Sequence, residues 1–147
     1  MAGVKIEHRI GVKAPAEAIW EIISDIEGWE AWNTLYPKAR GALRIGGALE
    51  LEVALPGQPR RAIRPVILDW VPNDQIHWRL SMFGGLVRTV RYLEIEALSE
   101  SGCIFSNGEI FDGWLGPLIA RQVGGAARQG FTTMGEAVKA LAEAKVR

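Results

Sequence analysis

The chain has 147 residues, of which 48% are hydrophobic, and its 17 basic and 17 acidic residues give a formal net charge of zero. This length and composition favour a single folded domain over residues 1–147 and exclude a disordered chain. Because no basic stripe and no run of about 18 apolar residues is present, we expect neither a nucleic-acid partner nor integral membrane association.

The first predicted element is a strand. Residues 4–12 (VKIEHRIGV) alternate apolar and polar side chains, which is typical of a strand with one buried face. Residues 14–25 (APAEAIWEIISD) follow and predict a helix, since Pro15 suits a first helical position and the apolar residues recur at helical spacing. Asp25 is the expected N-cap of a second, short helix.

Six tryptophans are the most distinctive residues of the chain, and each fills either a core or a pocket. Trp29 and Trp32 are three residues apart, so on a short helix they share one face. We expect Trp20 to point into the main core and Trp29 to pack the short helix onto the sheet or the helix end. Trp32 is expected to face inward at the rim of a hollow, near Asn33 and Tyr36.

The middle of the chain predicts strands. After a loop at residues 33–41, apolar and polar residues alternate again, and turns rich in glycine, proline, asparagine and aspartate divide the strands. The expected strands lie in residues 46–57, 60–74, 75–85, 87–98 and 102–113. With about six strands in this part of the chain, these five among them, and the opening strand, we expect seven strands in one curved antiparallel sheet.

Residues 89–111 predict a hairpin with a defined register. If it folds about Glu100, facing residues have numbers that sum to 200, so Arg91 faces Glu109 and Leu93 faces Asn107. We place this odd-numbered face toward the hollow and expect Arg91 and Glu109 to form an ion pair. The pair is either exposed at a wet mouth, where it contributes little, or a polar anchor that orients a ligand.

Residues 116–147 change to helical spacing and predict one long amphipathic helix from near Pro117 to about Lys145. Four glycines interrupt it, although a glycine inside a helix costs about 1 kcal/mol relative to alanine. They either allow close packing or a kink, or leave room for a ligand beneath the helix. The glycines are Gly124, Gly125, Gly130 and Gly135.

Three stretches carry a resemblance to a known family: residues 14–33 with their W-x-x-W-N ending, residues 75–80 (QIHWRL), and residues 105–119 (FSNGEIFDGWLGPLI). With the opening strand, they resemble the START/SRPBCC superfamily, which includes birch-pollen-allergen-like proteins and the polyketide cyclase/dehydrase family. The resemblance implies an α+β helix-grip fold, in which a curved antiparallel sheet surrounds the C-terminal helix. Where the family would have a histidine before the glutamate, this chain has Asn107, which argues against transferring a specific acid–base mechanism.

Motifs for known chemistry are absent from the sequence. There is no nucleophile elbow, zinc-binding histidine pair or phosphate loop, so we expect no cofactor and no metal, and the catalytic residues are unknown. His8 is interpreted as a core histidine or, as the alternative, a base, and His77 is expected to be exposed. Cys103 is the only cysteine, which excludes an intrachain disulfide. With no apolar segment at the N-terminus, we expect no signal peptide and a cytoplasmic location.

Two functions remain open at this point. The first is the binding of a hydrophobic or amphipathic small molecule, such as a lipid, an isoprenoid or a polyketide-like ring, by a monomer or a homodimer. The alternative is a cyclase or dehydratase that uses Glu109 and Arg91, with His8 as a further candidate. A third reading, action through the surface, lacks an evident exposed apolar patch. The expected ligand-binding residues are Trp32, Trp78, Leu80, Arg91, Leu93, Asn107, Glu109, Phe111, Ile119, Val123, Gly130 and Met134.

Overall fold

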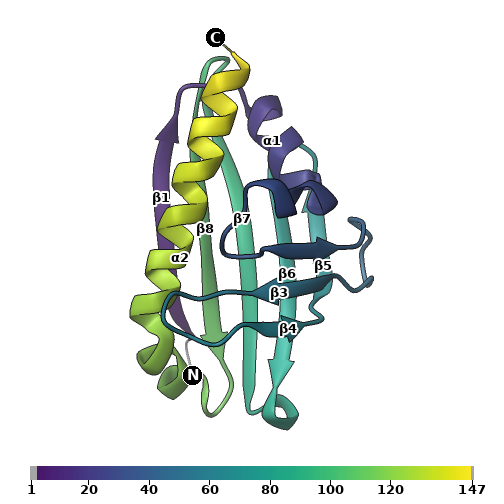
Figure 1. The fold of residues 1–147 in the computed structure, drawn as a ribbon, viewed down its shortest axis with the longest axis vertical. Coiled ribbons are helices and arrows are strands. Elements are labelled where there is room, and N and C mark those ends of the chain that lie inside the picture. The colour runs from purple at the N-terminus through teal and green to yellow at the C-terminus, as the bar shows by residue number, and fades with distance from the viewer. Residues whose placement is uncertain (1–2, 147) are drawn as a thin grey trace.

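The main sheet has five antiparallel strands in the order β1-β8-β7-β6-β5, and the long helix α2 crosses one of its faces (Figure 1). The computed structural model describes residues 3–146. It confirms the α+β helix-grip architecture. The elements of this layer are β1 (Val4–Val12), β5 (Val66–Val71), β6 (Gln75–Met82), β7 (Val87–Ser99), β8 (Gly102–Asp112) and α2 (Gly116–Lys145).

A second, three-stranded sheet lies over the main one and accounts for the difference from the expected strand count. Its strands are β2 (Lys38–Arg40), β3 (Glu50–Val53) and β4 (Arg61–Ile63), which gives eight strands over residues 3–146 where the sequence predicted seven. The two sheets are joined at one edge by backbone hydrogen bonds, among them Leu49 N to Pro65 O at 2.9 Å and Ile67 N to Gly47 O at 2.8 Å.

The expected strand over residues 60–74 is divided because of proline. Pro65 has no N–H to donate to a sheet, and the chain leaves β4 and enters β5 on either side of the Arg64–Pro65 step. The other missed strand, β2, lies inside the expected loop at residues 33–41 and has three residues, which is too few to show a period of two. One helical turn, η2 (Phe83–Gly85), links β6 to β7.

The two helices that follow β1 were both predicted. Helix α1 (Ala16–Ser24) buries Ile19, Ile22 and Ile23, and the 3-10 helix η1 (Ile26–Ala31) follows it directly. The Asp25 carboxylate accepts a hydrogen bond from Gly28 N at 3.3 Å, so Asp25 is the predicted cap. Trp20 lies at the edge of the core, half-buried and stacked on Trp70 with ring centroids 6.2 Å apart.

The hairpin of β7 and β8 has the predicted register. Arg91 faces Glu109 and Leu93 faces Asn107, and the register shifts only beyond Ala97, next to the turn. From Val87 to Ile95 every odd-numbered side chain is buried, so the odd face does point toward the interior. Alternation alone was sufficient to place these residues, because a slip by one position would turn the apolar side chains outward.

Helix α2 is continuous over 30 residues, and two of its glycines are sites of close packing. A Cβ at Gly135 would lie 2.6 Å from Nδ1 of His8, and one at Gly130 would lie 2.9 Å from Cδ1 of Leu35. A Cβ at Gly125, in contrast, would meet nothing within 4 Å. The close-packing alternative therefore accounts for Gly130 and Gly135.

Candidate functional site

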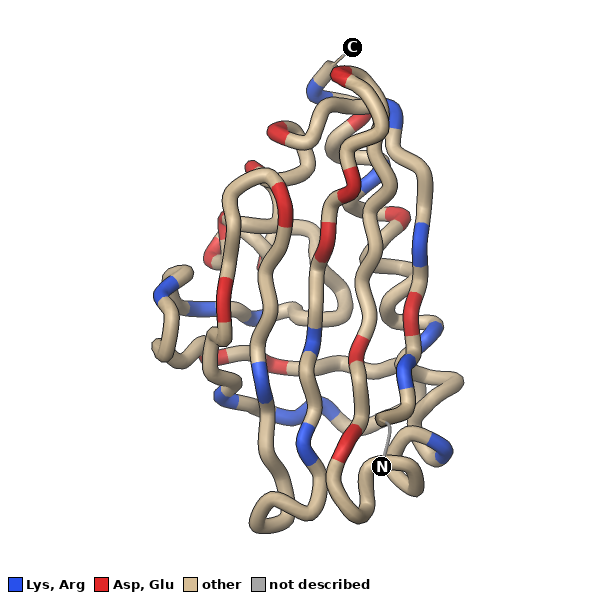
Figure 2. The backbone as a smooth tube through the Cα atoms, turned by 180° about the vertical axis from the view of Figure 1, so that it is seen from behind, with Lys and Arg blue, Asp and Glu red and all other residues tan. Residues whose placement is uncertain are grey.

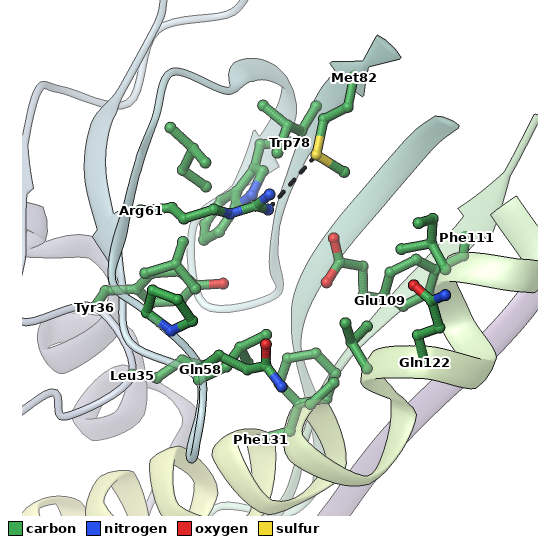
Figure 3. A pocket seen from close by; sticks show the side chains of 18 of the residues that line it. Leu35, Tyr36, Gln58, Arg61, Trp78, Met82, Glu109, Phe111, Gln122 and Phe131 are labelled. Carbon is green, nitrogen blue, oxygen red and sulfur yellow. Dashed lines mark hydrogen bonds between the residues drawn. The ribbon is translucent and has the colours of Figure 1, made fainter. Parts of the chain in front are cut away.

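A cavity of about 240 Å³ lies between the inner face of β6 and β8, the second sheet and the first half of α2 (Figure 3). Its walls are largely apolar, and β3, β4, β6, η2, β8 and α2 all contribute to them. The lining residues are Leu35, Tyr36, Val53, Leu55, Gln58, Pro59, Arg61, Ile63, Trp78, Leu80, Met82, Phe83, Glu109, Phe111, Ile119, Gln122, Val123, Ala127 and Phe131.

The structure brings half of the sequence-predicted site residues to this cavity. Those that line it are Trp78, Leu80, Glu109, Phe111, Ile119 and Val123. A second group is buried behind the wall: Arg91, Leu93, Asn107, Gly130 and Met134. The role of both groups in ligand binding stays a prediction. The second group does not line the cavity, so its members would affect a ligand only by positioning the lining residues.

The residues that the sequence reasoning missed come mainly from the second sheet and the loop before it. They include Tyr36, Val53, Arg61 and Ile63. The alternation in residues 46–57 was visible, but nothing in it indicated that this strand forms a separate sheet over the main one. Pro65 was the one available signal, since a proline inside an apparent strand argues for a break.

Arg91 is the central buried charge, with no exposed surface. All five of its N–H donors are used: Nε donates to the Tyr36 hydroxyl at 2.8 Å, Nη1 to the carbonyls of Tyr92 and Gly108, and Nη2 to Asn107 Oδ1 at 2.9 Å and Met134 Sδ. The guanidinium also lies 4.2 Å from the centroid of the Phe131 ring. Arg91 is thus saturated by uncharged partners.

The predicted ion pair between Arg91 and Glu109 is not formed. Their backbones face each other, but the hydrogen bonds of Arg91 turn its guanidinium toward Tyr36 and Asn107, whereas Glu109 points into the cavity (Figure 3). Asn107 links the sheet to the helix, since its Nδ2 donates to the carbonyl of Phe131 in α2 at 3.1 Å. The amide therefore binds Arg91 and α2 at the same time.

Glu109 is the carboxyl group of the cavity. Its half-buried side chain is surrounded by apolar walls, and this burial raises its pKa above the ordinary glutamate range. The Thr89 hydroxyl and the cations Arg91 and Arg61 act in the opposite direction without reversing the shift. A glutamate with a raised pKa retains its proton to higher pH and can donate a hydrogen bond.

The Tyr36 hydroxyl points into the same cavity (Figure 3). Since this oxygen already accepts a hydrogen bond from Arg91 Nε, its own proton is available for another acceptor. Burial raises the pKa of Tyr36, and the charge of Arg91 opposes that rise. Tyr36 is held by Trp29 and Trp78, with ring centroids at 5.6 and 5.7 Å.

Trp29, in η1, packs this short helix onto Trp78 of the main sheet, as predicted, whereas Trp32, the C-cap of η1, differs from the prediction. Trp29 is fully buried, packs against Tyr36 and Trp78 behind the cavity wall, and donates from Nε1 to the carbonyl of Ile23 at 3.2 Å. Trp32, expected at the rim of the hollow, instead lies at a separate open depression beside Leu141 and Lys145. A 3-10 helix has three residues per turn, so residues 29 and 32 lie on the same side of it. Of the two side chains, only Trp29 is fully buried.

The histidines lie outside the cavity. His8 packs beneath Gly135 of α2, where burial lowers its pKa and its Nδ1 has no hydrogen-bond partner. His77 is on the opposite face of the sheet, where it is partly buried instead of exposed as expected, 2.8 Å from the Glu94 carboxylate. Within residues 3–146, no group of three histidine, cysteine or acidic side chains is arranged to hold a metal ion.

Replacing Glu109 with glutamine is expected to change the pH dependence of stability. Because the folded-state pKa is raised above the ordinary value of about 4.3, the folded state binds more protons than the unfolded state between the two values, and stability falls as pH rises through that window. Glu109→Gln removes this fall in stability. The stability of the variant relative to the parent should therefore increase as pH rises through the window. Urea denaturation between about pH 4 and pH 8 measures the difference.

The exposed residue Glu100, at the hairpin turn, provides the control. Glu100→Gln should leave the pH dependence of the parent unchanged. If Glu109→Gln has the same pH slope as the parent throughout, the carboxyl group does not have the environment described here.

The long helix on a curved sheet, with a cavity between them, defines a helix-grip protein. The chain belongs to the polyketide cyclase/dehydrase and lipid transport family, whose model matches residues 3–139. No curated protein sequence matches the chain. No helix within residues 3–146 is long and apolar enough to cross a membrane.

Solved structures share the fold at low sequence identity. The ZhuI aromatase/cyclase from Streptomyces sp. R1128 is 21% identical with a TM-score of 0.78, covering 99% of this chain and 96% of that one. A START superfamily protein from Mycobacterium smegmatis is 19% identical with a TM-score of 0.73, covering 96% and 98%. A norcoclaurine synthase from Thalictrum flavum is 15% identical with a TM-score of 0.72, covering 100% and 99%.

Proposed function

We propose that this protein binds one small hydrophobic or amphipathic molecule in the cavity between the two sheets and α2. The observation that carries this proposal is the carboxyl group of Glu109, with its raised pKa, facing a cavity whose walls are otherwise mostly apolar. Such a site removes apolar ligand surface from water and orients the ligand by a few polar groups.

The size and polarity of the cavity narrow the class of ligand. Its volume of about 240 Å³ is below the roughly 300–1,000 Å³ of pockets for drug-sized ligands, which favours a compact ring system or one short chain over a two-chain lipid. Tyr36 offers a hydrogen-bond donor to this space, and Glu109 offers a carboxyl group whose pKa burial raises. A polyketide-like or isoprenoid ring with a hydroxyl or carbonyl oxygen meets both requirements.

The test uses a variant that fills the cavity. Val123 lines the cavity and Leu141 lies on the same helix away from it, so Val123→Trp should exclude the ligand and Leu141→Trp should not. Native mass spectrometry of the three proteins, each purified from the original host, measures the retained compound, and anilinonaphthalene sulfonate serves as a fluorescent probe. We expect at least about tenfold weaker probe binding for Val123→Trp alone. Equal loss in both variants would contradict the proposal.

A second candidate is a cyclase or dehydratase acting on the same ligand. The observation in its favour is the combination of Glu109, whose pKa burial raises, and Tyr36, which accepts a hydrogen bond from Arg91, around one cavity. General acid–base catalysis needs groups of this kind within reach of the reacting atoms. Under this candidate, Glu109→Gln abolishes conversion of the retained compound but leaves its binding within about tenfold. Conversion at the parent rate would exclude Glu109 as the acid or base.

A further inference from the structure

Four large apolar side chains are exposed at one end of the molecule, where the sequence had shown no evident patch. They are Phe83 (61% exposed), Leu86 (43%), Trp114 (80%) and Leu118 (48%), and we call them the apolar tip. Exposed residues of this size are unremarkable when scattered, but they indicate an interaction site when they are contiguous.

The tip is one surface because its two connections are bonded to each other. Phe83 and Leu86 belong to the β6–β7 connection, and Trp114 belongs to the β8–α2 connection; both lie at the lower end in Figure 1. Leu115 N donates to the carbonyl of Leu86 at 2.9 Å. Gly113 has a φ of +86°, and a Cβ there would lie 2.6 Å from that same carbonyl oxygen, so glycine permits the contact.

The apolar tip is also one end of the cavity. Phe83 lines the cavity while 61% of its surface remains exposed, and Met82 and Ile119 continue the lining from the two connected elements. Phe83 keeps a left-handed backbone with φ of +54°, in front of two glycines. A molecule that enters or leaves the cavity at this end therefore passes the apolar tip.

The charges of the chain are unevenly distributed along the long axis, and most basic residues lie toward the end that carries the tip, where the exposed Asp112, which faces Arg88 across β7 and β8, is an acidic exception (Figure 2). Residues 116–135 of α2 contain Arg121 and Arg128 and no acidic residue, and the β6–β7 connection is followed by the exposed Arg88. Residues 16–31, at the other end, contain five acidic residues and no basic one. Figure 2 shows most basic positions toward the lower end and most acidic positions toward the upper end.

We propose that the apolar tip docks on an anionic lipid surface and brings the mouth of the cavity to the membrane. Trp114 and Phe83 enter the interfacial layer, where aromatic side chains are favoured, and Arg88 and Arg121 contact lipid phosphates. The uneven charge distribution orients the molecule with this end toward the membrane. The contact is peripheral and requires no spanning helix.

The lipid surface fits these observations better than an acidic protein partner. The tip consists of side chains that project from two tight connections, with Trp114 80% exposed, and projecting aromatic residues with basic neighbours match an interfacial layer. A groove, in contrast, is the usual receptor for a protein segment.

The experiment is co-sedimentation of the full chain with two kinds of vesicle: phosphatidylcholine alone, and phosphatidylcholine mixed with phosphatidylglycerol. The parent should partition onto the anionic vesicles and much less onto the neutral ones. Trp114→Ala and Phe83→Ser should each weaken partitioning about tenfold. Arg88→Gln and Arg121→Gln should each weaken it about fivefold, on anionic vesicles only.

Leu98 provides the matched control, since it is 65% exposed at the opposite end, in the β7–β8 hairpin. Leu98→Ser should partition like the parent, and circular dichroism confirms the fold of every variant. The proposal is overturned if the parent does not sediment with anionic vesicles, or if Leu98→Ser weakens partitioning as much as Trp114→Ala. Capture of an acidic protein without vesicle binding would assign the tip to a protein partner and also overturn it. Probe binding in the cavity should be unchanged in Arg88→Gln, which separates this result from the proposed function.

Discussion

Replacing Arg91 with alanine should lower the free energy of unfolding by about 4 kcal/mol or more. The guanidinium supplies all the hydrogen bonds described above, and its removal takes one charged donor from each of three buried acceptors: the carbonyls of Tyr92 and Gly108 and the side chain of Asn107. Each hydrogen bond from a charged group contributes roughly 1.5–3 kcal/mol, and the volume left behind adds to the loss. Urea denaturation of the purified variant measures the change.

Two further arginine variants make the result specific. Arg79 is exposed on the neighbouring strand β6, so Arg79→Ala should stay within about 0.5 kcal/mol of the parent. Arg91→Lys keeps the charge but loses the planar set of donors, and it should recover only part of the stability. A recovery as complete as the parent would show that the charge, and not the five directed hydrogen bonds, is what matters.

Trp29→Ala should have the second large effect, a loss of about 3–5 kcal/mol. The side chain is fully buried, its Nε1 donates to Ile23, and it supports both Tyr36 and Trp78 from behind. Because those two residues line the cavity, the variant should also bind the fluorescent probe more weakly at temperatures where it remains folded.

Trp114 is the natural comparison for Trp29. It is 80% exposed, so Trp114→Ala should change the midpoint of thermal unfolding very little while Trp29→Ala lowers it strongly. An equal loss of stability in the two variants would contradict the assignment of Trp29 to the core and Trp114 to the surface.

The main-sheet hairpin could be predicted from the sequence almost to the residue. The facing of Arg91 by Glu109 followed from one turn and a period of two, both of which are local properties of the chain. The N-cap at Asp25 and the bounds of α2 followed from equally local rules.

The arrangement of the site depends on contacts between residues far apart in the sequence, which these local rules do not predict. Two residues that face each other on neighbouring strands can still adopt different side-chain rotamers. Arg91 therefore forms hydrogen bonds with Tyr36 and Asn107 and not with Glu109. In the same way, the sharing of one face by Trp29 and Trp32 did not decide which of them is buried. The second sheet was missed because its strands are short and pair with each other over the main sheet.

The hydrogen-bonded edge between the two sheets has a consequence for how this fold diversifies. The bonds that tie the second sheet to the first are concentrated around residues 46–49 and 65–67, at the far side of β5 from α2. Substitutions at Val53, Arg61 or Ile63 therefore reshape one wall of the cavity without touching the hydrogen bonds of the main sheet or the buried partners of Arg91. This wall of the cavity can therefore change over generations while the hydrogen bonds of the main sheet are kept.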